Sequence, residues 1–222
     1  AAMIELRDVA LSYTDRPLFE GVTLTLRHGE IALVRGRSGC GKTSLLRLLS
    51  RFLLPPHGSL PLDRRPYREF RYEELRTRVV YIHQSPVMDE TLPVLENILL
   101  PFSYGVHKTR KRPEEEEIRC LCADFHLRPE VLGREAGSLS VGEKQRVALI
   151  RAHLLRPEFM LLDEPLANLD EESAAAIGAW IARQTLANTG LVVASHQPVG
   201  GLPSEKVRVL QMAEGGRHER RD

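Results

Sequence analysis

A glycine-rich loop between two apolar segments constrains this chain more than any other feature of its sequence. Residues Ile31 to Val34 are all apolar and predict a buried strand, and a leucine-rich helical run follows the loop. The residues from Gly36 to Thr43 match the pattern G-x-x-x-x-G-K-T. In a strand–loop–helix setting this pattern indicates a phosphate-binding loop, and a turn that merely joins a strand to a helix is the less favoured interpretation.

Each residue type in the loop suits the phosphates of a nucleotide. Backbone amides can surround dense negative charge only where side chains do not intrude, which favours glycine. Lys42 supplies a positive charge for the outer phosphates, and the Thr43 hydroxyl can ligate magnesium. A helix that begins near Gly41 adds free amides and the positive end of its dipole. The predicted nucleotide-binding residues of the loop are Gly36, Arg37, Ser38, Gly39, Cys40, Gly41, Lys42, Thr43 and Ser44.

Length and charge narrow the remaining possibilities. The chain has 222 residues, of which 42% are hydrophobic, and can form one large domain or two small ones. Lys and Arg number 31 against 30 Asp and Glu, so the near-neutral charge makes no general case for nucleic-acid binding. No stretch approaches the roughly 18 consecutive apolar residues of a membrane span, and no leader pattern is visible. We therefore expect a chain that is neither secreted nor crosses a membrane by itself.

The three cysteines predict reduced thiols rather than disulfides or a zinc site. Cys120 and Cys122 are two positions apart in an expected helix, where they would not face each other. The count is odd, and a zinc site would need four ligands. Cys40 lies inside the phosphate loop, so we expect its alkylation to block nucleotide binding.

Apolar runs predict strands on both sides of the loop. Two strands at 4–9 and 22–26 are expected, with a turn around residues 15–17 between them. The turn-rich segment 55–66 predicts a loop with at most a short strand, and residues 215–222 predict a frayed tail. Helices are expected at 72–78 and about 171–185, core strands at 79–82, 159–162 and 191–194, and an edge strand at 207–212.

Helical spacing replaces the strand pattern between residues 91 and 157. The expected apolar faces are Leu92, Leu95, Ile98 and Leu99, and Ile118, Leu121, Cys122 and Phe125. The charged segment 108–117 predicts a solvated loop leading into a helix with acids in its first turn, in preference to an interaction patch. Ser140 and Glu143 predict a capping box that opens an amphipathic helix, which ends before Pro157.

Polar pairs directly follow three of the expected core strands. They are His83–Gln84, Asp163–Glu164 and Ser195–His196. Parallel α/β sheets place ligands at the carboxyl ends of their strands, so these pairs are expected to converge. Adjacent carboxylates suit magnesium and a water molecule at a phosphate site, although they could also merely open the following turn. Tyr13 could stack on an adenine, although half-buried packing is the commoner role of such a residue.

With these motifs in order, the sequence resembles the ATP-binding cassette (ABC) ATPases over essentially its whole length. A phosphate loop alone occurs in many NTPases, but a signature segment between Gln84 and the acidic pair is specific to this family. The matching segments are Tyr13 (A-loop), 36–43 (Walker A), Gln84 (Q-loop), 139–143 (signature), 159–164 (Walker B), 167–170 (D-loop) and His196 (switch histidine).

The resemblance implies an α/β fold of the P-loop NTPase type. This fold has a RecA-like core, an antiparallel β region and an inserted helical subdomain. We expect a single ABC ATPase domain over 1–222, with the core and β region at 1–84 and 158–222 and the helical subdomain at 85–157. The resemblance also implies a head-to-tail homodimer that closes on two ATP molecules with Mg²⁺.

The resemblance further implies a role for each matching residue. Tyr13 would stack on adenine, and Lys42 and the loop amides would hold the β- and γ-phosphates. Ser140 and Gly142, with Glu143 in the same signature segment, would reach the ATP held by the opposite subunit. The implied metal residues are Thr43, Gln84 and Asp163. The implied catalytic residues are Glu164, His196 and Gln84. Of these, Glu164 would polarise the attacking water and His196 would contact the γ-phosphate.

The signature departs from the family pattern at two positions. Val141 replaces the first signature glycine, and Glu143 replaces the usual glutamine. Because Ser140 and Gly142 remain, we expect the contact across the dimer to survive, although a β-branched residue restricts the backbone there. Ala167 in place of the common serine is a minor change.

The expected function is that of the ATP-hydrolysing subunit of a transporter. It would sit peripherally on the cytoplasmic face of the inner membrane and would not bind nucleic acid. It would bind separate transmembrane permease subunits through the groove near Gln84 and the segment 85–102. The alternative is a soluble ABC ATPase that acts on nucleic acid or ribosomes. Such proteins usually carry two cassettes, a zinc insertion or a long coiled coil, and none is seen here. A non-hydrolysing nucleotide sensor is disfavoured because Glu164 and His196 are both present.

Overall fold

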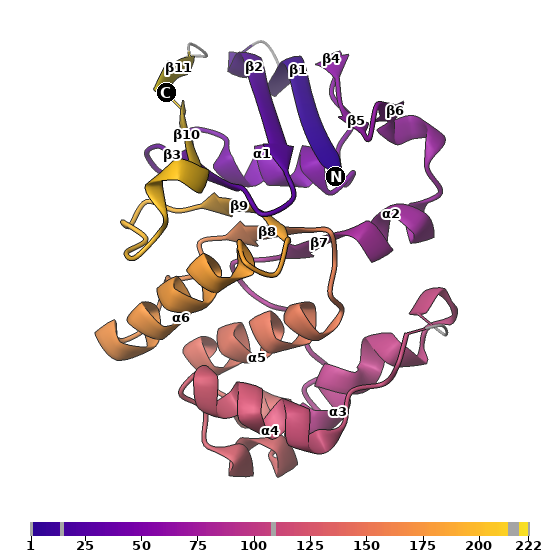
Figure 1. Ribbon diagram of the computed structural model, residues 1–222, viewed down its shortest axis with the longest axis vertical. Helices are drawn as coiled ribbons and strands as arrows, with labels where there is room; N and C mark the ends of the chain where they lie inside the picture. Colours follow the sequence, from indigo (N-terminus) through magenta and orange to yellow (C-terminus); the bar gives the residue numbers. More distant parts are fainter. Residues whose placement is uncertain (1, 14–15, 108–109, 213–217, 222) are drawn as a thin grey trace.

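The fold consists of two β-sheets with one helix between them and a layer of helices below. The computed structural model describes residues 2–13, 16–107, 110–212 and 218–221. In Figure 1 the strands β1 and β2 stand above helix α1, and the larger sheet lies below that helix. Helices α5 and α6 cover the far face of the larger sheet, and α3 and α4 lie beyond α5.

The larger sheet has six strands in the order β11-β10-β3-β9-β8-β7. All neighbours are parallel except β11, which pairs antiparallel with β10. Its inner strands are buried on both faces, which explains their continuous apolar sequences. The bounds are β3 Ile31–Arg35, β7 Val79–Ile82, β8 Phe159–Asp163, β9 Gly190–Ala194, β10 Val207–Met212 and β11 His218–Arg221.

The smaller sheet is antiparallel and has five strands. It follows the path β2-β1-β5-β6, and β4 also pairs with β1. Its bounds are β1 Met3–Tyr13, β2 Arg16–Arg27, β4 His57–Ser59, β5 Pro61–Leu62 and β6 Arg65–Pro66.

Side-chain alternation along the buried strands produces two hydrophobic cores. In β3, Ile31 and Leu33 face the core formed with the lower helices, whereas Ala32 and Val34 face the core around α1. Successive side chains of a strand point to opposite faces, so each buried strand contributes to both cores. The larger sheet is thereby held between helices on its two faces.

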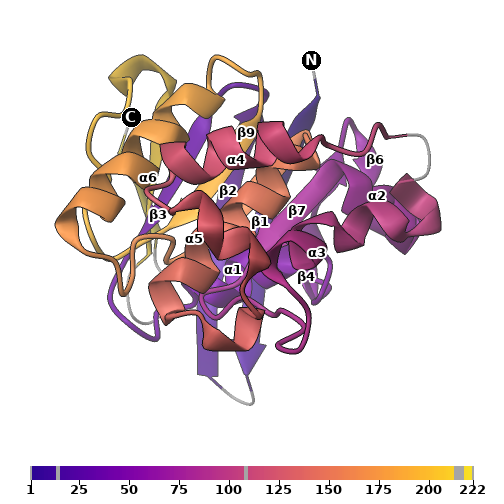
Figure 2. The same cartoon turned by 90° about the horizontal axis from the view of Figure 1, so that it is seen from below.

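The helices differ in length and in how deeply they are buried. Figure 2, seen from below, shows α4 and α5 crossing the underside of the molecule. The helices are α1 Lys42–Leu49, α2 Tyr72–Arg78, α3 Val94–Leu99, α4 Glu115–Asp124, α5 Val141–Leu154 and α6 Glu171–Gln184. Short 3₁₀ turns lie at Tyr67–Glu69, Leu100–Ser103, Gly105–His107, Pro129–Gly133, Ala136–Ser138 and Ser204–Lys206. Among the described residues, none of these helices combines the length and apolar character that a membrane span requires.

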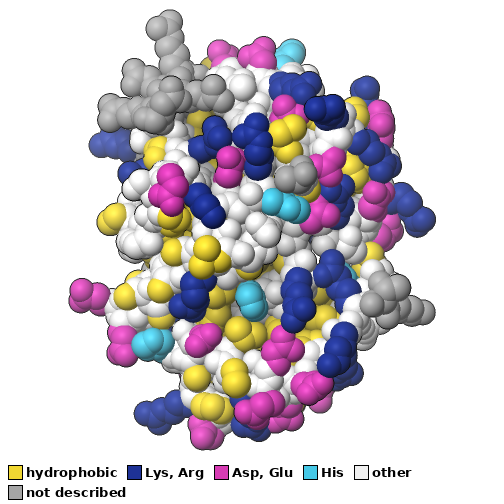
Figure 3. Space-filling view, viewed as in Figure 1, with side chains coloured by type: hydrophobic (Ala, Val, Ile, Leu, Met, Phe, Trp, Pro, Cys, Tyr) yellow, Lys and Arg dark blue, Asp and Glu magenta, His cyan; other side chains and the backbone are white. Residues whose placement is uncertain are grey.

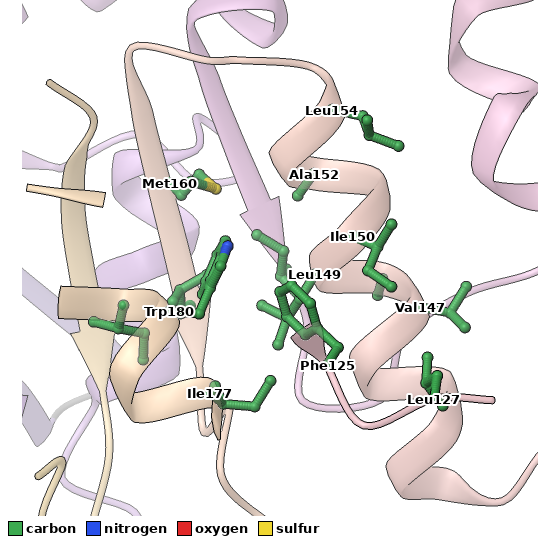
Figure 4. Close-up of a cluster of buried hydrophobic side chains, with 14 of the residues drawn as sticks. Phe125, Leu127, Val147, Leu149, Ile150, Ala152, Leu154, Met160, Ile177 and Trp180 are labelled. Carbon is green, nitrogen blue, oxygen red and sulfur yellow. The ribbon is translucent and has the colours of Figure 1, made fainter. Parts of the chain in front are cut away.

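A cluster of large side chains joins α6 to the helical block. Figure 4 shows Phe125, which follows α4, facing Trp180 of α6. Their ring centroids are 5.3 Å apart, and both side chains are at most 2% exposed. Aromatic burial of this size dominates core energetics, so the helices of 85–157 share one core with the parallel sheet.

Several predicted elements are confirmed. The strand at 79–82, the helix at 72–78 and the capping box at Ser140 and Glu143 occur as expected. Helix α4 begins with three glutamates in its first turn. The part of 108–117 at residues 108–109, like part of the predicted turn at 15–17, lies outside the described residues.

Other predictions were wrong. The segment 55–66 contains three short strands, because it completes the antiparallel sheet beside β1. Strand β10 is not at the edge, because residues 218–221 of the predicted frayed tail pair with it as β11. Leu92 precedes α3 rather than lying on it, since the helix begins at Val94.

Helix α5 is also not amphipathic. Its four consecutive residues from Val147 to Ile150, which point in different directions around a helix, are all buried. The reason is that the helix has the sheet on one side and α3 and α4 on another, which leaves it little solvent-facing surface. The division into a core and an inserted subdomain at 85–157 stays a proposal, supported by the lack of strands among residues 85–107 and 110–157.

Candidate functional site

An open cavity of about 500 Å³ lies where the carboxyl ends of the parallel strands meet the glycine-rich loop. The predicted convergence is confirmed, because residues from the loop, from the end of β7 and from the ends of β8 and β9 all line this cavity. The lining residues are Leu18, Ser38, Gly39, Gly41, Lys42, Thr43, Ser44, Gln84, Glu164 and His196.

Two loop glycines are required by their surroundings. A Cβ at Gly36 would lie 2.5 Å from Cys40 Sγ and 2.6 Å from the Met212 carbonyl oxygen. Gly41 caps α1 with a φ of 100°, and a Cβ there would lie 2.8 Å from Leu18 Cγ. Both contacts are shorter than real side chains make, so the loop can take this path only with glycine at these positions.

Lys42 places its ammonium group at the centre of the loop. The side chain is 7% exposed, and Nζ donates to the carbonyl oxygens of Gly36 at 2.9 Å and Arg37 at 3.2 Å. Glu164 Oε1 lies 3.5 Å from the same nitrogen. A nearly buried ammonium group with partly satisfied hydrogen bonding is well suited to attract phosphate oxygens.

Asp163 is held by donors from two different elements. Thr43 Oγ1, on α1, donates to Oδ1 at 3.2 Å, and the Tyr81 hydroxyl, on β7, donates to Oδ2 at 2.9 Å. The carboxylate is 2% exposed, so these hydrogen bonds replace the water it has lost. Burial first, and then the nearby Asp163 charge, raise the pKa of the Tyr81 phenol, which therefore remains a donor at neutral pH.

Glu164 and His196 form a pair beside the lysine. His196 Nδ1 lies 2.8 Å from Glu164 Oε2, and the His196 backbone N–H donates to the same oxygen at 3.2 Å. Glu164 has a φ of 48°, an uncommon conformation for a residue other than glycine. Its own N–H donates to the Ala194 carbonyl oxygen at 2.8 Å, which ties the Glu164 backbone to the end of β9.

The two residues that directly follow β7 have different surroundings. Gln84 lines the cavity, whereas the ring of His83 packs on Tyr81 with centroids 4.1 Å apart. Burial, followed by the nearby Arg47, lowers the pKa of His83, so this histidine is a neutral packing residue at pH 7.

The backbone of Tyr13 lies at the end of β1, but its side chain, and so its predicted adenine contact, lies outside the described residues.

The predicted effect of alkylating Cys40 needs correction. Its side chain is 4% exposed and belongs to the core around α1, so it points away from the cavity. Its position in the loop had suggested a thiol beside the nucleotide, but the thiol fills the space that Gly36 leaves open. A contribution of Cys40 to phosphate binding is therefore restricted to its backbone.

We expect a thiol reagent to modify this protein at Cys120 rather than at Cys40. Cys120 is exposed, whereas Cys40 and Cys122 are buried, and burial raises the pKa of Cys122 to about 11. Labelling at Cys120 should be at least roughly tenfold faster, because the other thiols react only after local opening. Peptide mass spectrometry after brief N-ethylmaleimide treatment would measure this, with the denatured chain as control. Equal labelling of Cys40 and Cys120 in the folded protein would contradict this placement of Cys40.

The signature segment lies apart from the cavity. Ser140 caps α5 by accepting the Glu143 N–H at 3.2 Å, and Glu143 Oε2 accepts the Ser140 N–H at 2.8 Å. Burial raises the pKa of Glu143, but the contacts with Ser140 and the nearby Arg134 outweigh burial and hold this pKa below its usual range. Neither residue lines the cavity, and Val141 between them is 54% exposed. Within this chain, Ser140, Gly142 and Glu143 therefore do not line the cavity.

Gly142 packs against the D-loop of its own chain. A Cβ at this position would lie 3.0 Å from the Asn168 carbonyl oxygen and 3.1 Å from Leu169 Cδ2. Arg146, one turn further along α5, donates to the Ser173 hydroxyl at 2.6 Å, and Ser173 in turn donates to Asp170 at 2.9 Å. The signature and the D-loop are therefore held together in this chain.

Sequence reasoning did not identify Leu18 or Tyr81 as site residues. Leu18 lines the cavity from β2, and no sequence pattern distinguished it from a packing residue. Tyr81 was treated as part of an apolar strand. The available signal was its hydroxyl, since a phenol within a core strand needs a hydrogen-bond partner.

The fold and the cavity together define a P-loop nucleotide-binding protein. The family model described as ABC transporter matches residues 19–167, which is more than half of the chain. The chain therefore belongs to the ABC transporter family, as its motifs predicted.

Similar proteins agree with this assignment. The chain is 33% identical to the spermidine/putrescine import ATP-binding protein PotA of Legionella pneumophila (strain Paris), over 94% of this chain and 56% of the relative. It is 28% identical to antigen peptide transporter 2 of Mus musculus, over 97% of this chain and 31% of the relative. The chain thus spans about a third to just over half of these relatives.

Solved structures confirm the predicted ABC ATPase fold. An ATP-binding subunit of an ABC transporter superposes with a TM-score of 0.84 at 22% identity, covering 98% of this chain and 90% of that one. A dimeric post-hydrolysis ATP-binding cassette bound to ADP and Pi superposes with a TM-score of 0.81 at 24% identity, covering 98% of both chains.

Proposed function

We propose that this cassette hydrolyses ATP with magnesium in a head-to-tail homodimer and drives separate transmembrane permease subunits. The observation that carries the proposal is the meeting of Lys42, Thr43, Asp163, Glu164 and His196 around one cavity. Each group matches a requirement of phosphoryl transfer, in which catalysis consists mainly of positioning and charge stabilisation.

The residues present fit a magnesium ion. The Thr43 hydroxyl and the Asp163 carboxylate are 3.2 Å apart, and magnesium prefers oxygen ligands of these kinds. Gln84, which lines the same cavity, would complete the protein's contribution. When bound, magnesium neutralises charge that develops between the outer phosphates.

The chain's own residues would perform the remaining steps. Lys42 and the loop amides would bind the β- and γ-phosphates, and Tyr13 would stack on the adenine. The Glu164 carboxylate would accept a hydrogen bond from the attacking water, and its contacts with the backbone and ring of His196 would hold it in line. His196 would also contact the γ-phosphate.

The dimer would complete the site. Ser140 caps the N-terminus of α5, and a helix N-terminus binds anions whichever chain supplies them. With Gly142 and Glu143, it would face the ATP bound by the opposite cassette. The packing of Gly142 against the D-loop and the link from Arg146 through Ser173 to Asp170 support the proposal, because they hold the signature and the D-loop together.

The membrane partner would dock in a groove between the parallel sheet and α5. This groove, of about 160 Å³, is lined by Val80, Tyr81, Ile82, His83, Pro86, Val87, Ala148, Arg151, Ala152 and Leu155. Its rim includes Val87, whose side chain is 76% exposed and whose carbonyl accepts a hydrogen bond from Arg151 at 3.1 Å. An apolar rim next to Gln84 suits the docking of a helix from the membrane partner, which would thereby be coupled to the nucleotide site.

We expect the cassette to be recovered from its host's membranes with a membrane-spanning chain, and Val87→Asp to weaken this association by about tenfold or more. The reason is that Asp would place a negative charge in the apolar contact between the groove and the membrane partner. Affinity purification from detergent-solubilised membranes and mass spectrometry would measure recovery. Leu186→Asp is the matched control, because Leu186 is 79% exposed and does not line the groove.

The same experiment tests the alternative function. Recovery of ribosomes or nucleic acid, without any membrane-spanning chain, would favour the soluble ABC ATPase. The face shown in Figure 3 carries basic and acidic side chains intermingled, which offers little support for a nucleic-acid surface. On the leading proposal the cassette is peripheral to the membrane, at its cytoplasmic face.

A further inference from the structure

We propose that Tyr81 is a positioning residue that holds the Asp163 carboxylate toward Thr43 and so sets how readily the cassette takes up magnesium with its nucleotide. Tyr81 lies outside the motifs by which the sequence resembles its family. The inference rests on the magnesium role proposed above for Thr43 and Asp163.

The two oxygens of Asp163 have separate donors. Oδ2 accepts the Tyr81 hydroxyl at 2.9 Å, and Oδ1 accepts Thr43 Oγ1 at 3.2 Å. A carboxylate is planar, so holding one oxygen also determines the direction of the other. When Thr43 turns to a metal ion, the bond from Tyr81 is the one that keeps Oδ1 pointing at that position.

Tyr81 is itself held in place. Arg47, on α1, lies near the phenol, and its positive charge opposes the rise in the pKa of Tyr81. The Tyr81 ring packs on His83 at a centroid distance of 4.1 Å and on Phe52 at 6.0 Å. These two neighbours restrict the rotation of the ring and so help to keep its hydroxyl within reach of Asp163.

Asp163 is 2% exposed, so water cannot easily replace a lost hydrogen bond to its carboxylate. Removing the Tyr81 hydroxyl leaves Oδ2 with no donor among the described residues. The carboxylate can then rotate, and the geometry offered to magnesium is no longer unique. The phosphate contacts of Lys42 and the loop do not involve Tyr81, so binding of nucleotide in the absence of metal should be unaffected.

The test uses the full chain and a fluorescent ATP analogue, with binding measured over a range of Mg²⁺ concentrations and again in EDTA. We expect Tyr81→Phe to raise the Mg²⁺ concentration at half-saturation by about tenfold, the effect of losing one hydrogen bond to a charged group. Affinity in EDTA should equal that of the wild type. The matched control is Tyr67→Phe, because Tyr67 is 3% exposed and its hydroxyl has no hydrogen-bond partner among the residues that the structure describes.

Three results would overturn the inference. They are an unchanged Mg²⁺ dependence for Tyr81→Phe, an equal change for Tyr67→Phe, and an equal loss of affinity in EDTA. Asp163→Asn separates this failure from failure of the proposed function. If Asp163→Asn leaves the Mg²⁺ dependence unchanged, the magnesium role itself is wrong, whereas an effect of Asp163→Asn without one of Tyr81→Phe removes the role of Tyr81 alone.

Discussion

Glu164→Gln is expected to lower ATP turnover by at least about 100-fold, the typical contribution of a positioned general base. The amide keeps the size of the side chain but no longer attracts the proton of the attacking water. Glu164 is suited to that role because the backbone N–H and ring of His196 orient its carboxylate next to Lys42. Nucleotide should still bind, so the variant should accumulate as an ATP-bound dimer.

Phosphate release and light scattering after size exclusion in ATP would measure these two effects. Glu205→Gln provides the control, because Glu205 is exposed and lies outside the cavity. Wild-type turnover in Glu164→Gln would exclude Glu164 as the base. Absence of a dimer at saturating ATP would show that the signature, with Val141 in place of glycine, does not engage a second nucleotide.

Lys42→Ala is expected to weaken ATP binding by roughly 10- to 100-fold, the range for losing a hydrogen bond to a charged group. The ammonium group is 7% exposed and is the cation that the structure places at Glu164. Without it, the Glu164 carboxylate and the carbonyl oxygens of Gly36 and Arg37 would face the phosphates uncompensated.

Equilibrium titration with a fluorescent ATP analogue would measure the affinity. Lys206→Ala removes a lysine far from the loop and should bind ATP as the wild type does. The effect of Lys42→Ala should shrink for a nucleotide without its outer phosphates, since the lost charge acts there. An equal affinity of Lys42→Ala and wild type for ATP would contradict the assigned loop geometry.

Local sequence patterns predicted much of the fold because the decisive interactions are local. The strand at 79–82 and the helix at 72–78 occur at the expected residues, and the capping box joins two residues only three apart. Where an element depends on a distant partner, local patterns were insufficient. Strand β4 forms because β1 offers it a free edge, and β10 has a further neighbour because the tail returns to it.

The same distinction applies to the site. The spacing of Gly36, Gly41, Lys42 and Thr43 could be predicted as a phosphate loop, because a backbone that surrounds an anion requires those residue types in that order. The direction of the Cys40 side chain could not be predicted, because it depends on the space beside Gly36. Tyr81 was overlooked for a related reason, since its partner Asp163 is 82 residues away.

The sequence by itself predicted a phosphate-binding loop and membership of the ABC family, because both depend on residue types at fixed spacings along the chain. Only the tertiary structure decided which side chains meet. It placed Glu164 between Lys42 and His196, buried the Cys40 thiol, and brought the Tyr81 hydroxyl to Asp163. The physical reason is that hydrogen bonds and ion pairs form between atoms a few ångströms apart, and the packing of the parallel sheet sets those distances.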